Sequence, residues 1–159
     1  MKVKELMRAT PYCCRPETNL GAASELMWNG NCGFLPIVGN DGKVFGVVTD
    51  RDICIALGTR NRLPGDILVS EVIASQKLFY CCPEDDVHVA LEAMQMGKVR
   101  RLPVIAHSGA LAGIISMDDV LQKAQPMNAG SRAELSSDEV VKTYQAITQR
   151  EQLAATVAA

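Results

Sequence analysis

The sequence contains one internal duplication, and this repeat constrains the fold more than any other feature of the chain. Pro83 lies 67 residues after Pro16. The same offset aligns the chain without an insertion from Tyr12 to Cys54. The most similar segments are Leu35–Val38 with Leu102–Ile105, Gly46–Thr49 with Gly113–Ser116, and Asp52–Ile53 with Asp119–Val120. Chance rarely maintains one register over such a length, so we predict two structurally equivalent units.

Each unit has the pattern of a strand, a helix, two further strands and a closing helix. In the first unit we expect a strand at Cys13–Arg15 and a helix that follows a cap at Thr18 or Asn19. Two strands at Phe34–Val38 and Val44–Thr49 and a helix at 50–57 complete it. In the second they are expected at Leu78–Cys81, Asp86–Met96, Arg101–Ile105, Leu111–Ser116 and Met117–Ala124. The turns Asn40–Gly42 and His107–Gly109 would join the paired strands, because such residues tolerate the φ angles of tight hairpins. The pattern predicts a mixed α+β fold of α/β type.

The pattern also predicts how the chain is divided. Residues 1–57 would form the first repeat, 58–68 a connector, 69–125 the second repeat, 126–135 a linker and 136–159 a C-terminal helix. The C-terminal helix is predicted from the capping box Ser136-x-x-Glu139, followed by Val140, Tyr144 and Ile147 on one stripe. Ahead of the common register, Val3–Met7 resembles Val69–Ile73, one residue out of step.

Charge and hydropathy exclude several partners. The formal charge of −2 does not favour nucleic-acid binding, and no apolar stretch reaches membrane-spanning length. No signal-peptide segment follows Met1–Glu5, so we expect a soluble, cytoplasmic protein without membrane contact. The six cysteines are expected to be free thiols. Adjacent side chains of an extended segment face opposite sides, which predicts that one member of Cys13/Cys14 and one of Cys81/Cys82 is buried.

Two pairs of segments connect the duplication to a known family. They are Phe34–Val38 with Gly46–Asp52, and Arg101–Ile105 with Gly113–Asp119. The second segment of each pair reads Gly-apolar-apolar-Ser/Thr-x-x-Asp. Over roughly residues 1–125 the chain resembles the CBS domain pair, or Bateman module, named after cystathionine β-synthase. The resemblance implies tandem CBS repeats packed about a pseudo-twofold axis, and a homodimer that in this family is often a flat disc.

The resemblance further implies two clefts for an adenosine-containing ligand such as AMP, ADP, ATP, NADH or S-adenosylmethionine. One would be centred on Thr49 and Asp52, the other on Ser116 and Asp119. A hydroxyl at this position can cap the helix and bond a ligand, and a carboxylate can accept from both hydroxyls of a ribose. The adenine would lie along Tyr12, Cys13, Cys14, Phe34, Leu35 and Pro36 in the first repeat, and along Tyr80, Cys81, Cys82, Arg101, Leu102 and Pro103 in the second.

The two implied clefts differ in charge. Arg51 stands inside the first motif, where it could pair with a phosphate, whereas the second motif has Met117 and Asp118. Arg100 and Arg101 could supply phosphate contacts, and the residues leave open which cleft they serve. Two simpler interpretations stand beside these. Thr49 and Ser116 can be plain helix caps, and the two arginines a solvated charge pair.

Nothing in the sequence favours catalysis. No nucleophile is paired with a general base, no glycine-rich loop cradles a phosphate, and Cys81, Cys82 and His88 lack the spacing of a zinc site. We therefore expect a regulatory protein without a metal or a catalytic cofactor, acting on a separate effector protein. The alternatives are a ligand-free scaffold and a thiol-redox sensor that uses the equivalent residues Cys14 and Cys81.

Three further residues carry expectations that the structure can check. His88 and His107 are expected to be ordinary surface residues. Trp28 follows the apolar stripe of the first helix at a position where the second repeat has Gln95. This tryptophan either covers the core or marks a contact surface.

Overall fold

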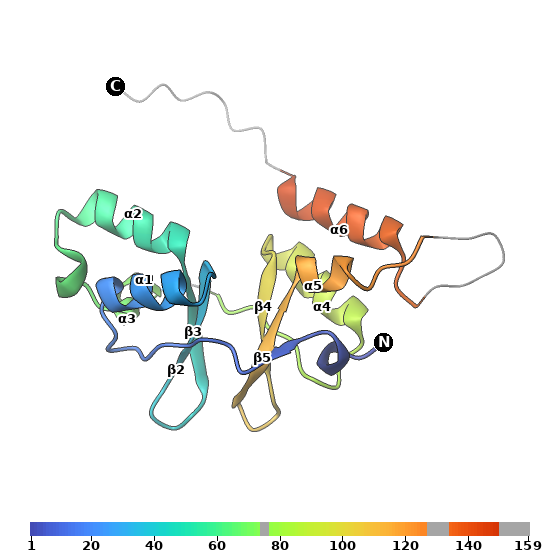
Figure 1. Cartoon of the computed structure of the whole chain (residues 1–159), viewed down its shortest axis with the longest axis horizontal. Helices are drawn as coiled ribbons and strands as arrows, with labels where there is room; N and C mark the ends of the chain where they lie inside the picture. The colour runs from blue at the N-terminus through green and yellow to red at the C-terminus, as the bar shows by residue number, and fades with distance from the viewer. Residues whose placement is uncertain (74–76, 127–133, 150–159) are drawn as a thin grey trace, which may run out of the picture.

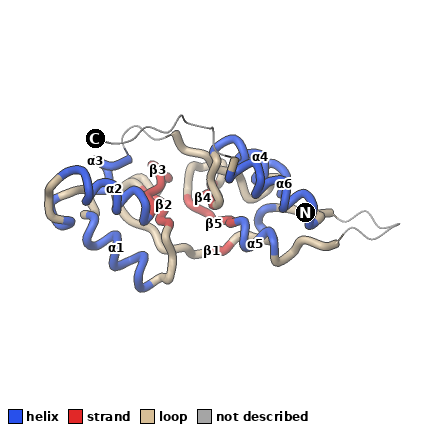
Figure 2. Tube along the Cα trace, turned by 90° about the horizontal axis from the view of Figure 1, so that it is seen from above, coloured by secondary structure: helices blue, strands red, loops and turns tan. Residues whose placement is uncertain are grey.

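The computed structural model describes residues 1–73, 77–126 and 134–149. These residues form two similar halves whose strands lie next to each other in the middle of the molecule, with the helices to either side (Figures 1 and 2). The first half contains α1 (Leu20–Asn29), β2 (Phe34–Val38), β3 (Val44–Thr49) and α2 (Asp50–Arg60). The second contains α4 (Val87–Gly97), β4 (Arg101–Ile105), β5 (Leu111–Ser116) and α5 (Met117–Leu121). The predicted mixed fold is confirmed.

The strand pairs of the two halves share one register. Leu35 pairs with Val48 in the β2–β3 hairpin, and Leu102 pairs with Ile115 in the β4–β5 hairpin. The antiparallel ladder is interrupted after Ile37 in the first hairpin and at the equivalent place in the second. The turns contain Gly42 and Gly109, both with positive φ. The tips of the two hairpins meet, since the N–H of Val44 donates to the carbonyl of Gly109 at 3.0 Å.

The helices begin where the sequence places a cap. Asn19 is the cap of α1, because its side chain accepts from the N–H of Ala22 at 2.9 Å. Asp86 caps α4 by accepting from the N–H of His88 at 3.1 Å, so this helix starts one residue after the predicted bound. The buried side chains of α1 are Leu20, Ala23 and Met27, as the apolar stripe predicts.

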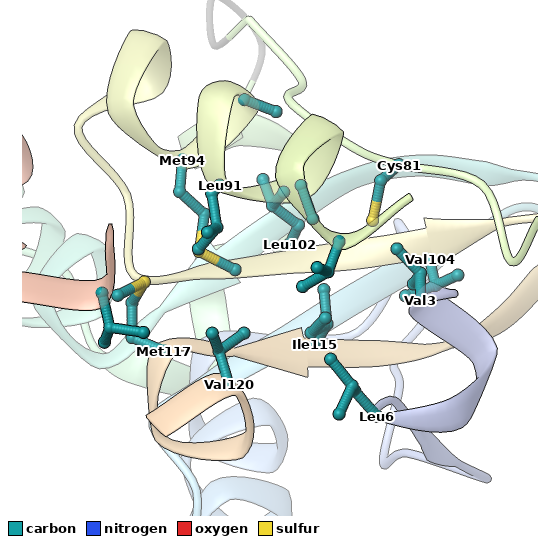
Figure 3. Close-up of a cluster of buried hydrophobic side chains, with 14 of the residues drawn as sticks. Val3, Leu6, Cys81, Leu91, Met94, Leu102, Val104, Ile115, Met117 and Val120 are labelled. Carbon is teal, nitrogen blue, oxygen red and sulfur yellow. The ribbon is translucent and has the colours of Figure 1, made fainter. Parts of the chain in front are cut away.

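Each half has its own aliphatic core. The first is built on fully buried side chains that include Leu35 and Ile37, and the second on Leu102, Val104 and Ile115. Figure 3 shows the second core between the helices and the strands. Each core therefore places the ends of two strands and the start of one helix in a fixed relation.

The chain exchanges short segments between the halves. A 3-10 turn at Val3–Glu5 packs in the second core, where Figure 3 shows Val3 and Leu6 beside the strands. The strand β1 (Arg8–Ala9) then adds to β5, which gives the sheet order β1-β5-β4. The equivalent helix α3 (Val69–Ile73) packs in the first core instead. Each half thus depends on a segment that comes before or after it in the chain.

The backbone contacts of the exchanged segments match one another. The N–H of Val3 donates to the carbonyl of Asp85 at 3.0 Å, and that of Val69 donates to the carbonyl of Thr18 at 2.8 Å. Asp85 and Thr18 are equivalent under the 67-residue offset, whereas Val3 and Val69 differ by one residue less. The two segments are therefore structurally equivalent, although their sequence similarity is one residue out of step with the rest of the repeat.

The predicted strands at Cys13–Arg15 and Leu78–Cys81 are shorter than expected. Only Cys14 and Cys81 form bridges, to Ile37 and Val104. The next residue in each case is engaged in a turn, because the N–H of Arg15 donates to Thr18 Oγ1 at 3.0 Å and that of Cys82 donates to Asp85 Oδ2 at 2.7 Å. These N–H groups are therefore not available to extend a ladder.

Two closing helices end elsewhere than predicted. Helix α2 continues past Leu57 to Arg60 and ends at the left-handed residue Asn61. Helix α5 ends at Leu121, because the residues that follow form a turn in which the N–H of Lys123 donates to the carbonyl of Val120 at 3.1 Å. The connector contains a 3-10 turn at Pro64–Asp66.

The C-terminal helix α6 (Ser137–Thr148) packs on the second half, against α4 and α5. Ser136 caps it as predicted and forms the reciprocal box with Glu139. Val140, Thr143 and Ile147 are its buried residues. Residues 150–159 of the predicted helix, and 127–133 of the predicted linker, lie outside the described residues.

The segment exchange predicts that a residue at the N-terminus stabilises the second half. Val3→Ala should lower the free energy of unfolding by about 2 kcal/mol, because it removes two buried methyl groups and leaves a cavity. Urea denaturation followed by circular dichroism measures this loss. Val89→Ala, at an exposed position of α4, is the control and should cost less than about 0.5 kcal/mol. A Val3→Ala protein as stable as the control would contradict the exchange.

Candidate functional site

The two Ser/Thr-x-x-Asp motifs have the same geometry at the junction of a strand and a helix. Thr49 ends β3 and caps α2; its N–H donates to Asp52 Oδ2 at 2.9 Å, and its Oγ1 accepts from the N–H of Asp52 at 3.2 Å. In the second half, the Ser116 N–H donates to Asp119 Oδ2 at 2.9 Å, and Ser116 Oγ accepts from the Asp119 N–H at 3.2 Å. The capping role is confirmed. Each box also holds a carboxylate and a hydroxyl side by side.

The segments predicted to hold an adenine lie next to these junctions. Phe34 is the direct partner of Thr49 across the β2–β3 ladder. On the other side of β2, the N–H of Cys14 donates to the carbonyl of Pro36 at 3.0 Å. The second half has the same arrangement, in which Arg101 pairs with Ser116 and Cys81 donates to Pro103. The predicted residues of each cleft are therefore on neighbouring extended segments.

The side chains of these predicted residues differ in their exposure to solvent. Leu35 and Leu102 are fully buried in the two cores, and Pro36 and Pro103 are buried beside them. Tyr12, Cys13 and Tyr80 are exposed, while Cys82 is partly buried. A ligand lying along these segments would meet the exposed side chains of Tyr12, Cys13 or Tyr80, and beyond them the backbone of the buried strands.

One residue of the second junction, Arg8, was not predicted from the sequence. Its Nε donates to Asp119 Oδ1 at 2.9 Å, and only 9% of the Asp119 side chain is exposed. Arg8 reaches this position because β1 pairs with β5, where Arg8 is opposite Ile114. The similarity of Val3–Met7 to Val69–Ile73 was the available signal, but it did not indicate that the two segments change places.

The predicted phosphate-binding arginines occupy different places. Arg51, Arg100 and Arg101 are all exposed. Arg101 lines a cleft of about 430 Å³ on the first half, although its strand belongs to the second. The cleft is lined by Ser24, Met27, Trp28, Asn31, Cys32, Gly33, Asp50, Ile53 and Arg101, and we call it the Trp28 cleft. In the described part of the chain, Arg101 is the one predicted ligand-binding residue that lines it.

His88 is a bridging residue rather than an ordinary surface histidine. Its Nδ1 hydrogen-bonds Asp86 Oδ1, and its Nε2 lies 3.2 Å from Glu139 Oε1 on α6. The hydrogen bond to Asp86 raises the pKa of His88, and the Glu139 carboxylate acts in the same direction. The backbone and ring N–H groups of His88 in turn lower the pKa of Asp86 to about 2. His107 is exposed in its turn, as expected.

The cysteines are free, and one of each adjacent pair is buried as predicted. Burial raises the pKa of the Cys14 thiol to about 11. Burial, with a smaller effect from Asp85, raises that of Cys81 to about 12. Both thiols are therefore protonated near neutral pH, which does not favour a redox role. They belong to different cores.

The described residues contain neither a cluster suited to a metal ion nor a helix suited to a membrane. No three His, Cys, Asp or Glu side chains of residues 1–73, 77–126 and 134–149 gather where they could hold a metal ion. Over the same residues, no helix has the length and apolar character needed to cross a membrane.

Comparison with known proteins assigns the family. The CBS domain model matches residues 3–59 and 69–125, so the chain belongs to the CBS domain family. The resemblance seen in the two motifs is thereby confirmed.

Two relatives differ greatly in length. Hypoxic response protein 1 of Mycobacterium tuberculosis is 31% identical over 117 residues, which are 74% of this chain and 80% of that protein. Inosine-5'-monophosphate dehydrogenase of Methanocaldococcus jannaschii is 30% identical over 124 residues, which are 77% of this chain but only 23% of the enzyme. The chain thus spans about a quarter of the enzyme's length.

Two solved structures share the fold. Hypoxic Response Protein I with two coordinated zinc ions superposes with a TM-score of 0.72 at 28% identity, covering 79% of this chain and all of that one. The CBS domain protein PAE2072 from Pyrobaculum aerophilum, complexed with AMP, gives a TM-score of 0.65 at 25% identity and covers 76% and 90% of the two chains.

The position of His88 predicts a pH dependence of stability. Because its pKa is higher in the folded protein, the contribution of protonated His88 is complete below the unfolded value of about 6.5 and is lost as the pH rises through the folded pKa. The difference in melting temperature between wild type and His88→Gln should be larger at about pH 5.5 than at about pH 8.5. His107→Gln is the control. Equal differences for His88→Gln at both pH values would contradict this account.

The cysteine environments predict a clear order of reactivity. At about pH 8, Cys14 and Cys81 should react with iodoacetamide at least about tenfold more slowly than exposed Cys54, because they are buried and protonated. Peptide mass spectrometry of the labelled protein measures each site, and the unfolded protein should label fully. Labelling of Cys14 or Cys81 as fast as Cys54 would support the redox-sensor alternative instead.

Proposed function

We propose that this CBS domain pair is a regulatory module that binds AMP or a related adenosine nucleotide and passes the binding signal to a separate protein, without catalysing a reaction. The observation that carries the proposal is the duplicated junction, in which a hydroxyl and a carboxylate stand beside an extended segment. The AMP bound by PAE2072 supports the choice of ligand. S-adenosylmethionine, ADP, ATP and NADH share the adenosine group and are the other candidates.

The chemistry of the junction suits a nucleoside. The capping box occupies Oδ2 of each aspartate, and a carboxylate has further acceptor capacity for the two hydroxyls of a ribose. The neighbouring strand edge offers backbone groups to the adenine, while exposed Tyr12 or Tyr80 could cover its face. The hydroxyls of Thr49 and Ser116 lie where the phosphate side of the ligand would begin.

We propose that the first cleft binds more tightly than the second. Helix α2 has 11 residues and Arg51 in its first turn, both of which favour a phosphate. Helix α5 has five residues, and its first turn carries Asp118 and Asp119 without a base, whereas Arg51 accompanies Asp50 and Asp52 in α2.

A ligand would act by stabilising one arrangement of the two halves. Exposed Arg101 of the second half lines the same hollow as Asp50, the first residue of α2. A phosphate held by residues of both halves would therefore favour one relative position of the halves, which a partner protein could recognise.

One observation favours a scaffold without ligand as the second candidate. The polar groups of the second junction already bond one another and Arg8 within the chain. A repeat can retain such a structure after its ligand site has been lost. The binding experiment below separates the two functions.

Binding is tested by thermal shift and calorimetry with AMP, ADP, ATP, NADH and S-adenosylmethionine. At a ligand concentration of about 100 times Kd, the melting temperature should rise, because binding adds about 2.7 kcal/mol to stability. Asp52→Asn keeps a capping side chain but removes the charge that accepts from the ribose, and should weaken AMP binding about tenfold or more.

Asp119→Asn reports on the second cleft, and Asp138→Asn, an exposed first-turn acid of α6, is the matched control. AMP binding that both Asp52→Asn and Asp119→Asn leave unchanged would overturn the site. No response to any of the five compounds would favour the scaffold.

A further inference from the structure

The guanidinium of Arg8 bonds the carboxylate that the second cleft would offer to a ligand. Arg8 Nε donates to Asp119 Oδ1 at 2.9 Å. The Arg8 side chain is 71% exposed, whereas only 9% of the Asp119 side chain is exposed. The oxygen of Asp119 that is not used by the capping box therefore already has a partner, and that partner is in contact with water.

The Asp119 carboxylate has too few acceptor positions for Arg8 and a ribose together. An ionised carboxylate offers about four lone-pair positions. The N–H and the hydroxyl of Ser116 both donate to Oδ2, and Arg8 donates to Oδ1. About one position then remains, while a ribose has two hydroxyls to place. A ribose held through both hydroxyls would therefore displace Arg8.

The backbone of Arg8 is held against the second half, so the side chain is the part that can yield. Arg8 pairs with Ile114, and Ala9 pairs with Gly113, in the β1–β5 ladder. A Cβ at position 113 would lie 2.6 Å from the Arg8 carbonyl oxygen, so glycine at this position lets β1 approach β5 closely. Displacement of Arg8 from Asp119 is thus a rotation of the side chain that leaves β1 in place.

The exposure of Arg8 limits the strength of its contact with Asp119. Water and salt screen such an ion pair, and pairs of this kind change an equilibrium by about fivefold at most. Hydrogen bonds from ribose hydroxyls to the same carboxylate are charge-assisted and can replace it. The contact would therefore weaken ligand binding at the second cleft without preventing it.

We propose that Arg8 is an internal competitor for the ribose in the second cleft: it occupies the Asp119 carboxylate until a nucleoside with both ribose hydroxyls displaces it. The inference rests on the proposed function, because it concerns the ribose contact of that site. It makes a residue of the N-terminal segment, whose Val3 packs in the second core, a determinant of ligand affinity and selectivity.

Calorimetry with adenosine tests the competition in an Asp52→Asn background, in which the first cleft is weakened. Adenosine has no phosphate, so the loss of a cation does not weaken its attraction to the protein. Adding Arg8→Gln should raise the adenosine affinity about fivefold. Arg8→Lys keeps the charge and should stay within about twofold of the Arg8 protein. Lys4→Gln is the matched control, because it removes the same charge from the same segment, at the ion pair with Glu84.

The acceptor count supplies a second readout that a merely structural effect of Arg8 would not move. 2′-Deoxyadenosine lacks one of the two hydroxyls, so it can bond Asp119 while Arg8 stays in place. Arg8→Gln should therefore change the affinity for 2′-deoxyadenosine by less than about twofold. In an Asp119→Asn protein, Arg8→Gln should give no gain for adenosine either.

The outcomes separate this inference from the proposed function. An adenosine affinity that Arg8→Gln leaves unchanged or lowers would overturn the competition, and so would an equal gain for adenosine and 2′-deoxyadenosine. In each of these cases the binding itself would still support the proposed function. If neither adenosine nor AMP bound wild type or any variant, the proposed function would fail, and the inference with it.

Discussion

The reciprocal box between a strand end and a helix start organises each half of this protein. The hydroxyl of Thr49 or Ser116 satisfies a helix N–H, and the aspartate three residues later returns a hydrogen bond to the strand's last N–H. Because β3 and β5 are buried on the core side, this box also fixes the direction in which α2 and α5 leave the sheet. The segments proposed to hold the adenine lie next to it, because Phe34 pairs with Thr49 and Arg101 pairs with Ser116.

The duplication made most of this arrangement predictable. The four ladder strands lie at their predicted residues, since short apolar runs, a glycine turn and a hydroxyl cap indicated the ends of the strands. The predicted strands at Cys13–Arg15 and Leu78–Cys81 were too long. The side chains of Thr18 and Asp85 accept from the backbone N–H of Arg15 and Cys82, which a longer ladder would need. A propensity for extended structure does not reveal such competition between a turn and a ladder.

Contacts between distant segments were not predictable in the same manner. The exchange of Val3–Glu5 and Val69–Ile73 leaves the hydrophobic pattern of each segment unchanged, whichever half receives it. Arg8 therefore remained unnoticed as a partner of Asp119, and His88 as a link between α4 and α6. The candidate site was predicted as far as it lies within one repeat. The contributions that cross from one segment to another required the structure.

The two halves are alike in backbone and differ in what surrounds them. Arg8 and α6 are both added to the second half, and both engage positions that the duplication repeats in the first. The first half thus retains the longer closing helix, the arginine in its motif and the open cleft at Trp28. We propose that this asymmetry concentrates ligand binding on the first repeat, while the second is held in place by the rest of the chain.

The most direct measurement is a crystal structure of the chain grown with AMP. The account predicts electron density for the nucleotide at the β3–α2 junction, with the ribose hydroxyls within hydrogen-bond distance of the Asp52 carboxylate and the adenine beside the Cys14–Pro36 segment. AMP bound away from both Ser/Thr-x-x-Asp junctions, with Asp52 and Asp119 making no contact to it, would contradict the central claim.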